Sequence, residues 1–171
     1  MTGLLAVMAG VAIPQFAAGL DRSRAWAGAR YLAARMATAR AYAVLHSAHV
    51  ALRFAEEESG VSFQLFVDGN QNGVRNADID SGIDRPLDMP ARLPELFAGV
   101  DIAIAPELGT DPIRLGPSDL LSFTPLGTAT PGTLYVRGRD GLQLAVRVLG
   151  ATARTRVLRY VPQTHGWEES F

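Results

Sequence analysis

The first fifty residues of the chain carry a helical hydrophobic pattern, whereas the remainder alternates between apolar and polar positions. Residues 3–20, GLLAVMAGVAIPQFAAGL, hold no charged side chain. An apolar run of about 18 residues lies at the lower limit of what crosses a bilayer as a helix. Three interpretations of this segment stay open: a membrane anchor, a cleaved secretory signal that lacks the usual basic start, and a buried core helix.

The helical pattern continues through residues 21–47 with a stripe of mostly small apolar side chains. They recur at intervals of three, four or seven residues: Ala25, Ala29, Leu32, Met36, Ala39, Ala43 and Val50. Small side chains let a neighbouring surface approach closely, so we expect this stripe to pack on the chain's own sheet. The helix should end near His46 or Ser47, because the pattern then changes to period two.

Residues 48–171 form a β-rich head. Segments 50–54 and 61–67 flank a charged turn closed by Gly60, which predicts an antiparallel hairpin. Residues 68–98 are rich in Asp, Asn, Gly and Pro, and they predict a long surface excursion without a strand. Alternation returns in six later segments, 100–105, 113–115, 120–123, 133–137, 142–149 and 154–161. The chain is therefore expected to be α+β, with a long N-terminal helix whose C-terminal half packs on an antiparallel head.

Composition limits the chemistry that is available. All 16 basic residues are arginine, and cysteine is absent, which excludes disulfides and thiolate metal sites. The formal net charge of −1 hides three blocks, +5 over residues 1–55, −9 over residues 56–111 and +3 over residues 112–171. Such blocks set the order of subunits in an assembly, whereas in a monomer they are solvated faces.

Catalytic motifs are missing from the sequence. It has no Gly-x-Ser-x-Gly elbow and no Gly-rich phosphate loop entering a helix, and no acidic residue is spaced to complete a metal site with its three histidines. We therefore expect no enzyme, no cofactor and no small-molecule substrate.

One loop resembles a calcium-binding loop. Asp68, Asn70 and Asn72 place oxygen side chains at positions 1, 3 and 5, and Gly73 stands at position 6. Position 12, which should supply a bidentate carboxylate, is Ile79. An Asx-rich turn, in which Asp and Asn side chains bind the local backbone, is the favoured interpretation.

Arginines gather in the last two predicted strands, at positions 147, 154, 156 and 159. Side chains two residues apart share a face of a strand, so Arg154 and Arg156 should project together, a geometry suited to backbone phosphates. The alternative is a solvated strand edge whose charges discourage pairing with other sheets.

Several segments together resemble the GspH/FimT family of minor pseudopilins. The resemblance is carried by Leu4-Leu-Ala-Val-Met-Ala-Gly-Val-Ala-Ile-Pro14-Gln-Phe16, Ala39-Arg-Ala-Tyr-Ala43, His49-Val-Ala-Leu52, Phe66-Val-Asp-Gly-Asn-Gln-Asn-Gly-Val-Arg75 and Leu121-Ser-Phe-Thr-Pro-Leu-Gly-Thr128. It spans nearly the whole chain and implies a type IV pilin-like fold. It also implies a structural subunit near the tip of a type II secretion pseudopilus or a type IV pilus.

The resemblance assigns a place and partners to each part of the chain. Residues 1–20 are expected to anchor the subunit in the bacterial inner membrane, with the head in the periplasm, and later to enter the filament core. The partners are other minor and major pseudopilins. The side chains implied in membrane and filament packing are Leu4, Leu5, Val7, Val11, Ile13, Pro14 and Phe16.

Two features depart from the family. The family's Gly-Phe-Thr-Leu-x-Glu processing site is replaced by Met1-Thr-Gly3, so we expect either a start upstream of Met1 or a degenerate member. Some FimT-like members bind DNA for uptake through a C-terminal Gly-Arg-x-Arg motif, and here Ala153 stands in place of the glycine before Arg154 and Arg156. Binding of DNA through these two arginines is the alternative function.

Overall fold

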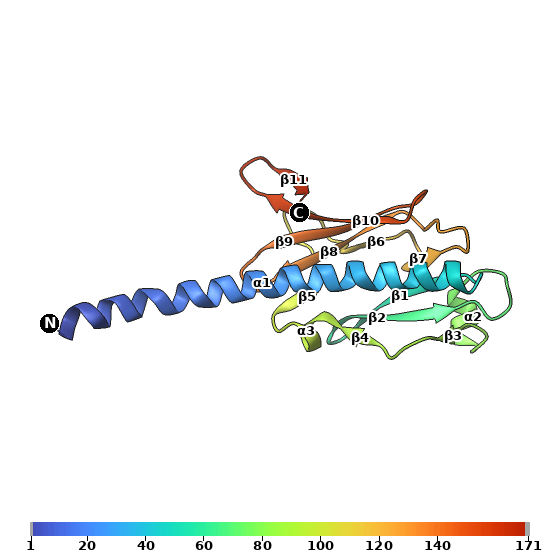
Figure 1. Cartoon of the computed structure of the whole chain (residues 1–171), viewed down its shortest axis with the longest axis horizontal. Coiled ribbons are helices and arrows are strands. Elements are labelled where there is room, and N and C mark those ends of the chain that lie inside the picture. Colours follow the sequence, from blue (N-terminus) through green and yellow to red (C-terminus); the bar gives the residue numbers. More distant parts are fainter. Residues whose placement is uncertain (1, 170–171) are drawn as a thin grey trace.

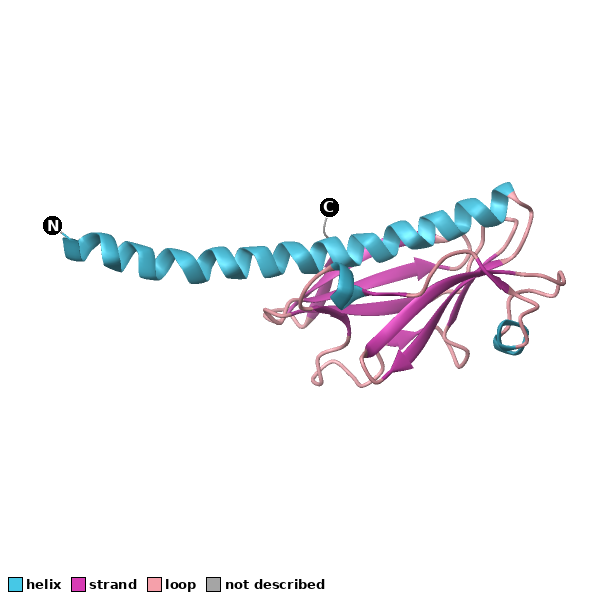
Figure 2. Cartoon of the chain, turned by 90° about the horizontal axis from the view of Figure 1, so that it is seen from below, coloured by secondary structure: helices cyan, strands magenta, loops and turns pink. Residues whose placement is uncertain are grey.

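A long helix leads into a β-rich head in this computed structural model, which describes the backbone of residues 2–169 and the side chains of residues 18–169. The helix, α1 (Thr2–Leu45), has its C-terminal half along the head, whereas its N-terminal half extends away from it (Figure 1). Figure 2 shows the same arrangement from below, with the sheets gathered on one side of the helix. The predicted α+β class is confirmed.

The first sheet contains the predicted hairpin. Its order is β3-β2-β1-β7, and β4 also pairs with β2; all of its pairings are antiparallel. Its strands are β1 (Val50–Glu57), β2 (Gly60–Val67), β3 (Arg85–Pro86), β4 (Ala91–Arg92) and β7 (Leu120–Phe123).

The second sheet has the order β11-β10-β9-β8-β5, with β6 paired to β8, and it is also antiparallel. Its strands are β5 (Val100–Ile102), β6 (Ile113–Arg114), β8 (Gly132–Gly138), β9 (Gln143–Leu149), β10 (Arg154–Val161) and β11 (Gly166–Glu169). Two short helices, α2 (Asn76–Asp80) and α3 (Leu93–Leu96), lie in the connection between β2 and β5.

The main core lies between α1 and both sheets. Buried side chains of α1 join those of the first sheet, such as Phe63 and Phe123, and those of the second, such as Leu134 and Val146. Alternate residues of β9, including Leu144 and Val148, point into this core, as period two requires. The core therefore depends on all three layers.

The structure differs from the predicted elements at several boundaries. β1 continues to Glu57 because Glu57 pairs with Gly60, so only residues 58 and 59 form the turn. The prediction that residues 68–98 hold no strand was wrong, because β3 and β4 pair with β2 over two residues each. Such short pairings, like the polar β11, leave too few residues for a hydrophobic pattern.

Leu32 tests the packing of the helix on the sheets. Its side chain is fully buried in the main core, so Leu32→Ala should lower the free energy of unfolding by about 2–5 kcal/mol. The matched control is Leu45→Ala on the same helix, because Leu45 is 79% exposed and should change stability by less than about 0.5 kcal/mol. Thermal unfolding of the full chain measures both, and equal effects would contradict the docked helix.

Candidate functional site

One face of α1 is completely covered by the head. The predicted stripe of Ala25, Ala29, Leu32, Met36, Ala39 and Ala43 has no exposed surface at all. The close approach extends to Gly28, where an added Cβ would lie 2.9 Å from Cγ1 of Val100. Small side chains therefore let β5 and its neighbours reach the helix backbone.

Polar contacts fix α1 at several places along the head. Arg22 Nε lies 3.8 Å from Oδ2 of Asp140, where the helix enters the head. Arg35 forms an ion pair with Asp88, and near the far end Arg40 Nε donates to the carbonyl oxygen of Gly127 at 3.1 Å. Surface pairs of this kind add little energy, so the buried stripe, rather than these pairs, holds the helix on the head.

The N-terminal half of α1 is helical but stands apart from the head (Figure 1). The side chains assigned to membrane and filament packing, Leu4, Leu5, Val7, Val11, Ile13, Pro14 and Phe16, lie outside the described side chains. Within the described residues, no helix combines the length and the apolar character needed to cross a membrane. Residues 18–20 are exposed.

The second sheet has an outer face that points away from α1. Thr155 of β10 faces the helix, since its hydroxyl lies 3.9 Å from Sδ of Met36. Strand alternation assigns Arg154 and Arg156 to the opposite face from Thr155. Leu158 follows them there and packs against Tyr135 and other side chains in a separate small cluster. Arg154, at the start of β10, also lines a hollow with Ala37 and Ala41 of α1.

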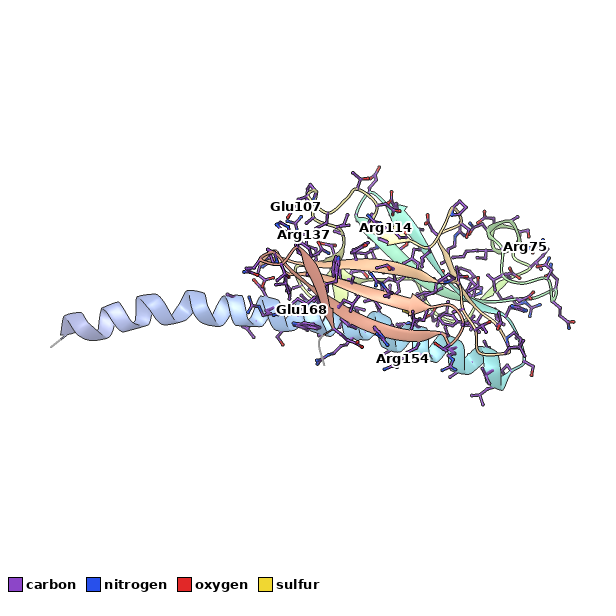
Figure 3. All side chains as sticks on the ribbon, turned by 90° about the horizontal axis from the view of Figure 1, so that it is seen from above. Arg75, Glu107, Arg114, Arg137, Arg154 and Glu168 are labelled. Atoms are coloured by element: carbon purple, nitrogen blue, oxygen red, sulfur yellow. The ribbon has the colours of Figure 1, made fainter. Side chains whose placement is uncertain are left out.

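Strand register aligns arginines from distant parts of the sequence. Arg156 is directly opposite Arg147, Arg147 is opposite Thr133, and Thr133 is opposite Arg114. These four residues form a row across β10, β9, β8 and β6, which we call the arginine row. Figure 3 labels Arg154 at the rim of the second sheet beside α1, and Arg114 farther from the helix. Arg114 also lies over the Tyr135 ring, with Cζ 5.1 Å from the ring centroid.

Acidic residues of β11 contact two of these arginines. Arg156 Nη1 lies 3.2 Å from Oε2 of Glu169 on the outer face. Arg159, which was grouped with the same cluster, occupies the helix-facing side and lies 3.5 Å from Glu168. Among the described residues, no acidic side chain lies within 4 Å of Arg154, so Arg154 differs from Arg156 and Arg159 in having no acidic competitor for a partner there.

Ala153 has the backbone conformation of a glycine. Its φ is +49°, and it is buried at the start of β10. A non-glycine residue in this region costs about 1–3 kcal/mol. The left-handed turn at Ala153 directs the chain into Arg154.

The Asp68 loop is closed by its own hydrogen bonds. Oδ1 of Asp68 accepts from the backbone N–H groups of Asn70 at 3.0 Å and Gln71 at 2.8 Å, and Oδ2 accepts from that of Gly73 at 2.7 Å. Burial acts to raise the pKa of Asp68, but the backbone N–H groups of residues 70–73 outweigh it and hold the pKa below its ordinary value. This geometry is that of an Asx-rich turn.

The remaining groups of this loop also bind protein atoms. The side-chain amides of Asn70 and Asn72 donate to Oδ2 of Asp78 at 3.4 and 3.0 Å. Within the described part of the chain, no three His, Cys, Asp or Glu residues are grouped as metal ligands would be. The calcium interpretation of Asp68, Asn70 and Asn72 stays a prediction.

Asp84 is a structural residue that the sequence pattern did not identify. It is 1% exposed and accepts from the backbone N–H of Gly69 at 3.0 Å and of Arg75 at 2.9 Å, so it joins the two ends of the loop. Gly69 is required beside it, because a Cβ there would lie 2.0 Å from the carbonyl oxygen of Ile83. Nothing local in the sequence distinguishes Asp84 from the other acids of this segment.

Asp68→Asn tests the structural role of this carboxylate. Because the folded protein lowers the pKa of Asp68, the stabilisation is present above about pH 4 and is lost as pH falls through the folded-state value. The substitution should cost about 1 kcal/mol at pH 7 and nothing once Asp68 is protonated. Melting temperature against pH measures this, and a cost that does not change between pH 7 and pH 2 would contradict the assignment.

The chain matches the model of a known protein family. The family model for type II transport protein GspH matches residues 28–152, which is more than two thirds of the chain. The matched segment begins inside the docked half of α1 and ends before Arg154 and Arg156. No curated protein and no solved structure matches the chain significantly. The length of the family match shows that the chain belongs to the GspH family of type II transport proteins.

Proposed function

We propose that this GspH-family pseudopilin is a structural subunit at or near the tip of a type II secretion pseudopilus, where it assembles through its N-terminal helix. The observation that supports the proposal is the division of α1, whose second half is buried in the head while its first half extends free of it (Figure 1). A helix without contacts to its own domain has its surface available for neighbouring helices.

The docked half supports this proposal mechanically. The stripe from Ala25 to Ala43 is buried along its whole length, so force on the free half reaches the head through a continuous packed layer. In the filament, burial of the apolar segment would contribute about 25 cal/mol per Å² removed from water, less the cost of ordering the subunits. The partners in this proposal are other minor and major pseudopilins.

Before assembly, the same apolar segment would hold the subunit in the bacterial inner membrane with the head in the periplasm. A helix of 20 residues spans about 30 Å, comparable to the hydrocarbon core of a bilayer. Residues 3–20 carry no charge, and the first charged residue is Asp21. The end of the uncharged segment thus coincides with the start of the docked half.

Charge in the free half tests helix-mediated assembly. Val7→Asp combined with Val11→Asp should abolish co-purification with the other pseudopilins, because a carboxylate within an apolar helix interface costs several kcal/mol. Leu45→Asp is the matched control, since Leu45 is exposed at the end of the docked half. Retention of the partners by the double variant would contradict assembly through this segment.

The arginine row favours a second function, in which the chain is a FimT-like minor pilin that binds DNA for uptake. Arg147 and Arg156 are direct neighbours across β9 and β10, and Arg154 lies on the same face. Positive side chains at this spacing can neutralise successive phosphates without reading bases. The contact between Arg156 and Glu169 would have to yield to a phosphate.

DNA binding is tested by Arg154→Ala combined with Arg156→Ala in a gel-shift assay at low and moderate salt. The double variant should lose a salt-sensitive shift, because each phosphate contact contributes to the release of counterions. Arg159→Ala is the matched control, since Arg159 belongs to the same strand but faces the helix side. If the unmodified chain causes no shift at low salt, this second function is eliminated.

A further inference from the structure

A hollow of about 420 Å³ lies where α1 enters the head. It is lined by Ser23, Trp26, Ala27 and Arg30 of the helix and by Arg159 from β10. A larger hollow of about 570 Å³ shares Trp26 and Arg159 with it. Figure 3 shows Glu168, the neighbour of Arg159, beside the part of α1 that enters the head, whereas Arg154 lies toward the opposite end of the same sheet. We call the smaller space the proximal hollow.

The proximal hollow has the chemistry of an anion site. Two guanidinium groups and one hydroxyl group line it, and none of its lining residues is acidic. Arg30 Cζ lies 5.8 Å from the centroid of the Trp26 ring, so the cation rests near the indole face. Arginine forks match the oxygen atoms of a phosphate, and a serine hydroxyl adds another donor.

The acidic residues near the proximal hollow do not prevent its two arginines from binding an anion. Glu107 and Asp140 line the larger hollow, where Asp140 lies 3.8 Å from Arg22 and reduces its positive charge. Asp21, just before Ser23, pairs with Arg24, whereas among the residues lining the proximal hollow, Arg159 has an acidic partner, Glu168, whose Oε2 lies 3.5 Å from Arg159 Nη2. Both side chains of that pair are about half exposed, so their mutual attraction is weak and a phosphate can replace it.

The position of the hollow indicates which anion it meets. Ser23 comes three residues after Leu20, the last residue of the uncharged segment, which corresponds to about 4.5 Å along the helix axis. Tryptophan concentrates at the interface between a bilayer and water, and arginine forks bind the phosphate oxygens of a headgroup. The hollow therefore lies at the level of the headgroups if residues 3–20 are inserted.

We propose that the proximal hollow binds the headgroup phosphate of an anionic phospholipid. Arg30 and Arg159 donate to the phosphate oxygens with Ser23, and Trp26 lies in the interface. Binding of the headgroup holds the end of the head at which α1 enters it against the membrane, until the subunit moves into the filament. This inference rests on the membrane stage of the proposed function.

The test uses the full chain with Trp167→Phe, which leaves Trp26 as the single tryptophan, reconstituted with vesicles of phosphatidylcholine alone or with added phosphatidylglycerol. Flotation with the vesicles measures membrane insertion, and the emission of Trp26 measures its environment. We expect flotation in both cases and a larger blue shift of the emission with phosphatidylglycerol than with phosphatidylcholine alone. Inorganic phosphate added to the vesicles without phosphatidylglycerol should leave the emission unchanged.

Variants in the same background connect the shift to the hollow. Arg30→Gln and Arg159→Gln should each raise the phosphatidylglycerol content needed for the half-maximal shift by about fivefold, the factor for one charge beside an anionic surface. Glu168→Gln should lower it, because Arg159 loses its competing acid. Arg154→Gln is the matched control on the same strand and should change nothing.

Three outcomes would overturn the inference. The first is the same emission with and without phosphatidylglycerol, and the second is an equal loss in Arg154→Gln. The third is a full shift with inorganic phosphate alone, which would assign the hollow to free anions. Failure of the chain to float with either vesicle would instead contradict the membrane stage of the proposed function, and the inference with it.

Discussion

Burial of one face of α1 between two sheets is the constraint on which the rest of the structure depends. Six residues from Ala25 to Ala43 lose all of their exposed surface, and both sheets direct their alternate apolar side chains at them. Leu32 and Met36 each contribute about 1.5–3 kcal/mol by burial, whereas the alanines mainly permit the close approach. Without this layer, each sheet would expose an apolar face to water.

The same packing divides the head into two kinds of surface. Residues of β10 alternate between the helix side and the outer side, which places Thr155 and Arg159 on one and Arg154 and Arg156 on the other. The outer side carries the arginine row, and the helix side carries the proximal hollow. Successive side chains of a strand point to opposite faces of the sheet, so one arginine-rich strand contributes to two separate basic surfaces.

Much of the fold could be predicted from the sequence, because hydrophobic periodicity is a local signal. The buried stripe of α1, the hairpin of β1 and β2 and the core face of β9 all follow from spacing alone. β3, β4 and β11 could not be predicted, because their pairings depend on an open edge of β2 or β10 rather than on their own composition. The class of the protein required the order of several weak motifs along the chain.

The arginine row and the proximal hollow could be predicted from the sequence only in part. The common face of Arg154 and Arg156 follows from alternation, but the alignment of Arg147 with Arg156 and of Arg114 with Thr133 is set by register. Asp84 joins backbone groups at positions 69 and 75, a role that only the folded loop reveals. Arg30 and Arg159 lie far apart in the sequence and line one hollow only because β10 lies along α1.

The central claim is that the second half of α1 stays docked on the head while the first half assembles with other subunits. A disulfide between Gly28→Cys and Val100→Cys tests it directly, because the chain has no other cysteine and a Cβ at residue 28 would lie 2.9 Å from Cγ1 of Val100. We predict that the disulfide forms within one subunit and that the oxidised protein co-purifies with pseudopilins as well as the reduced protein does. Failure to form it, or loss of the partners on oxidation alone, would contradict the account.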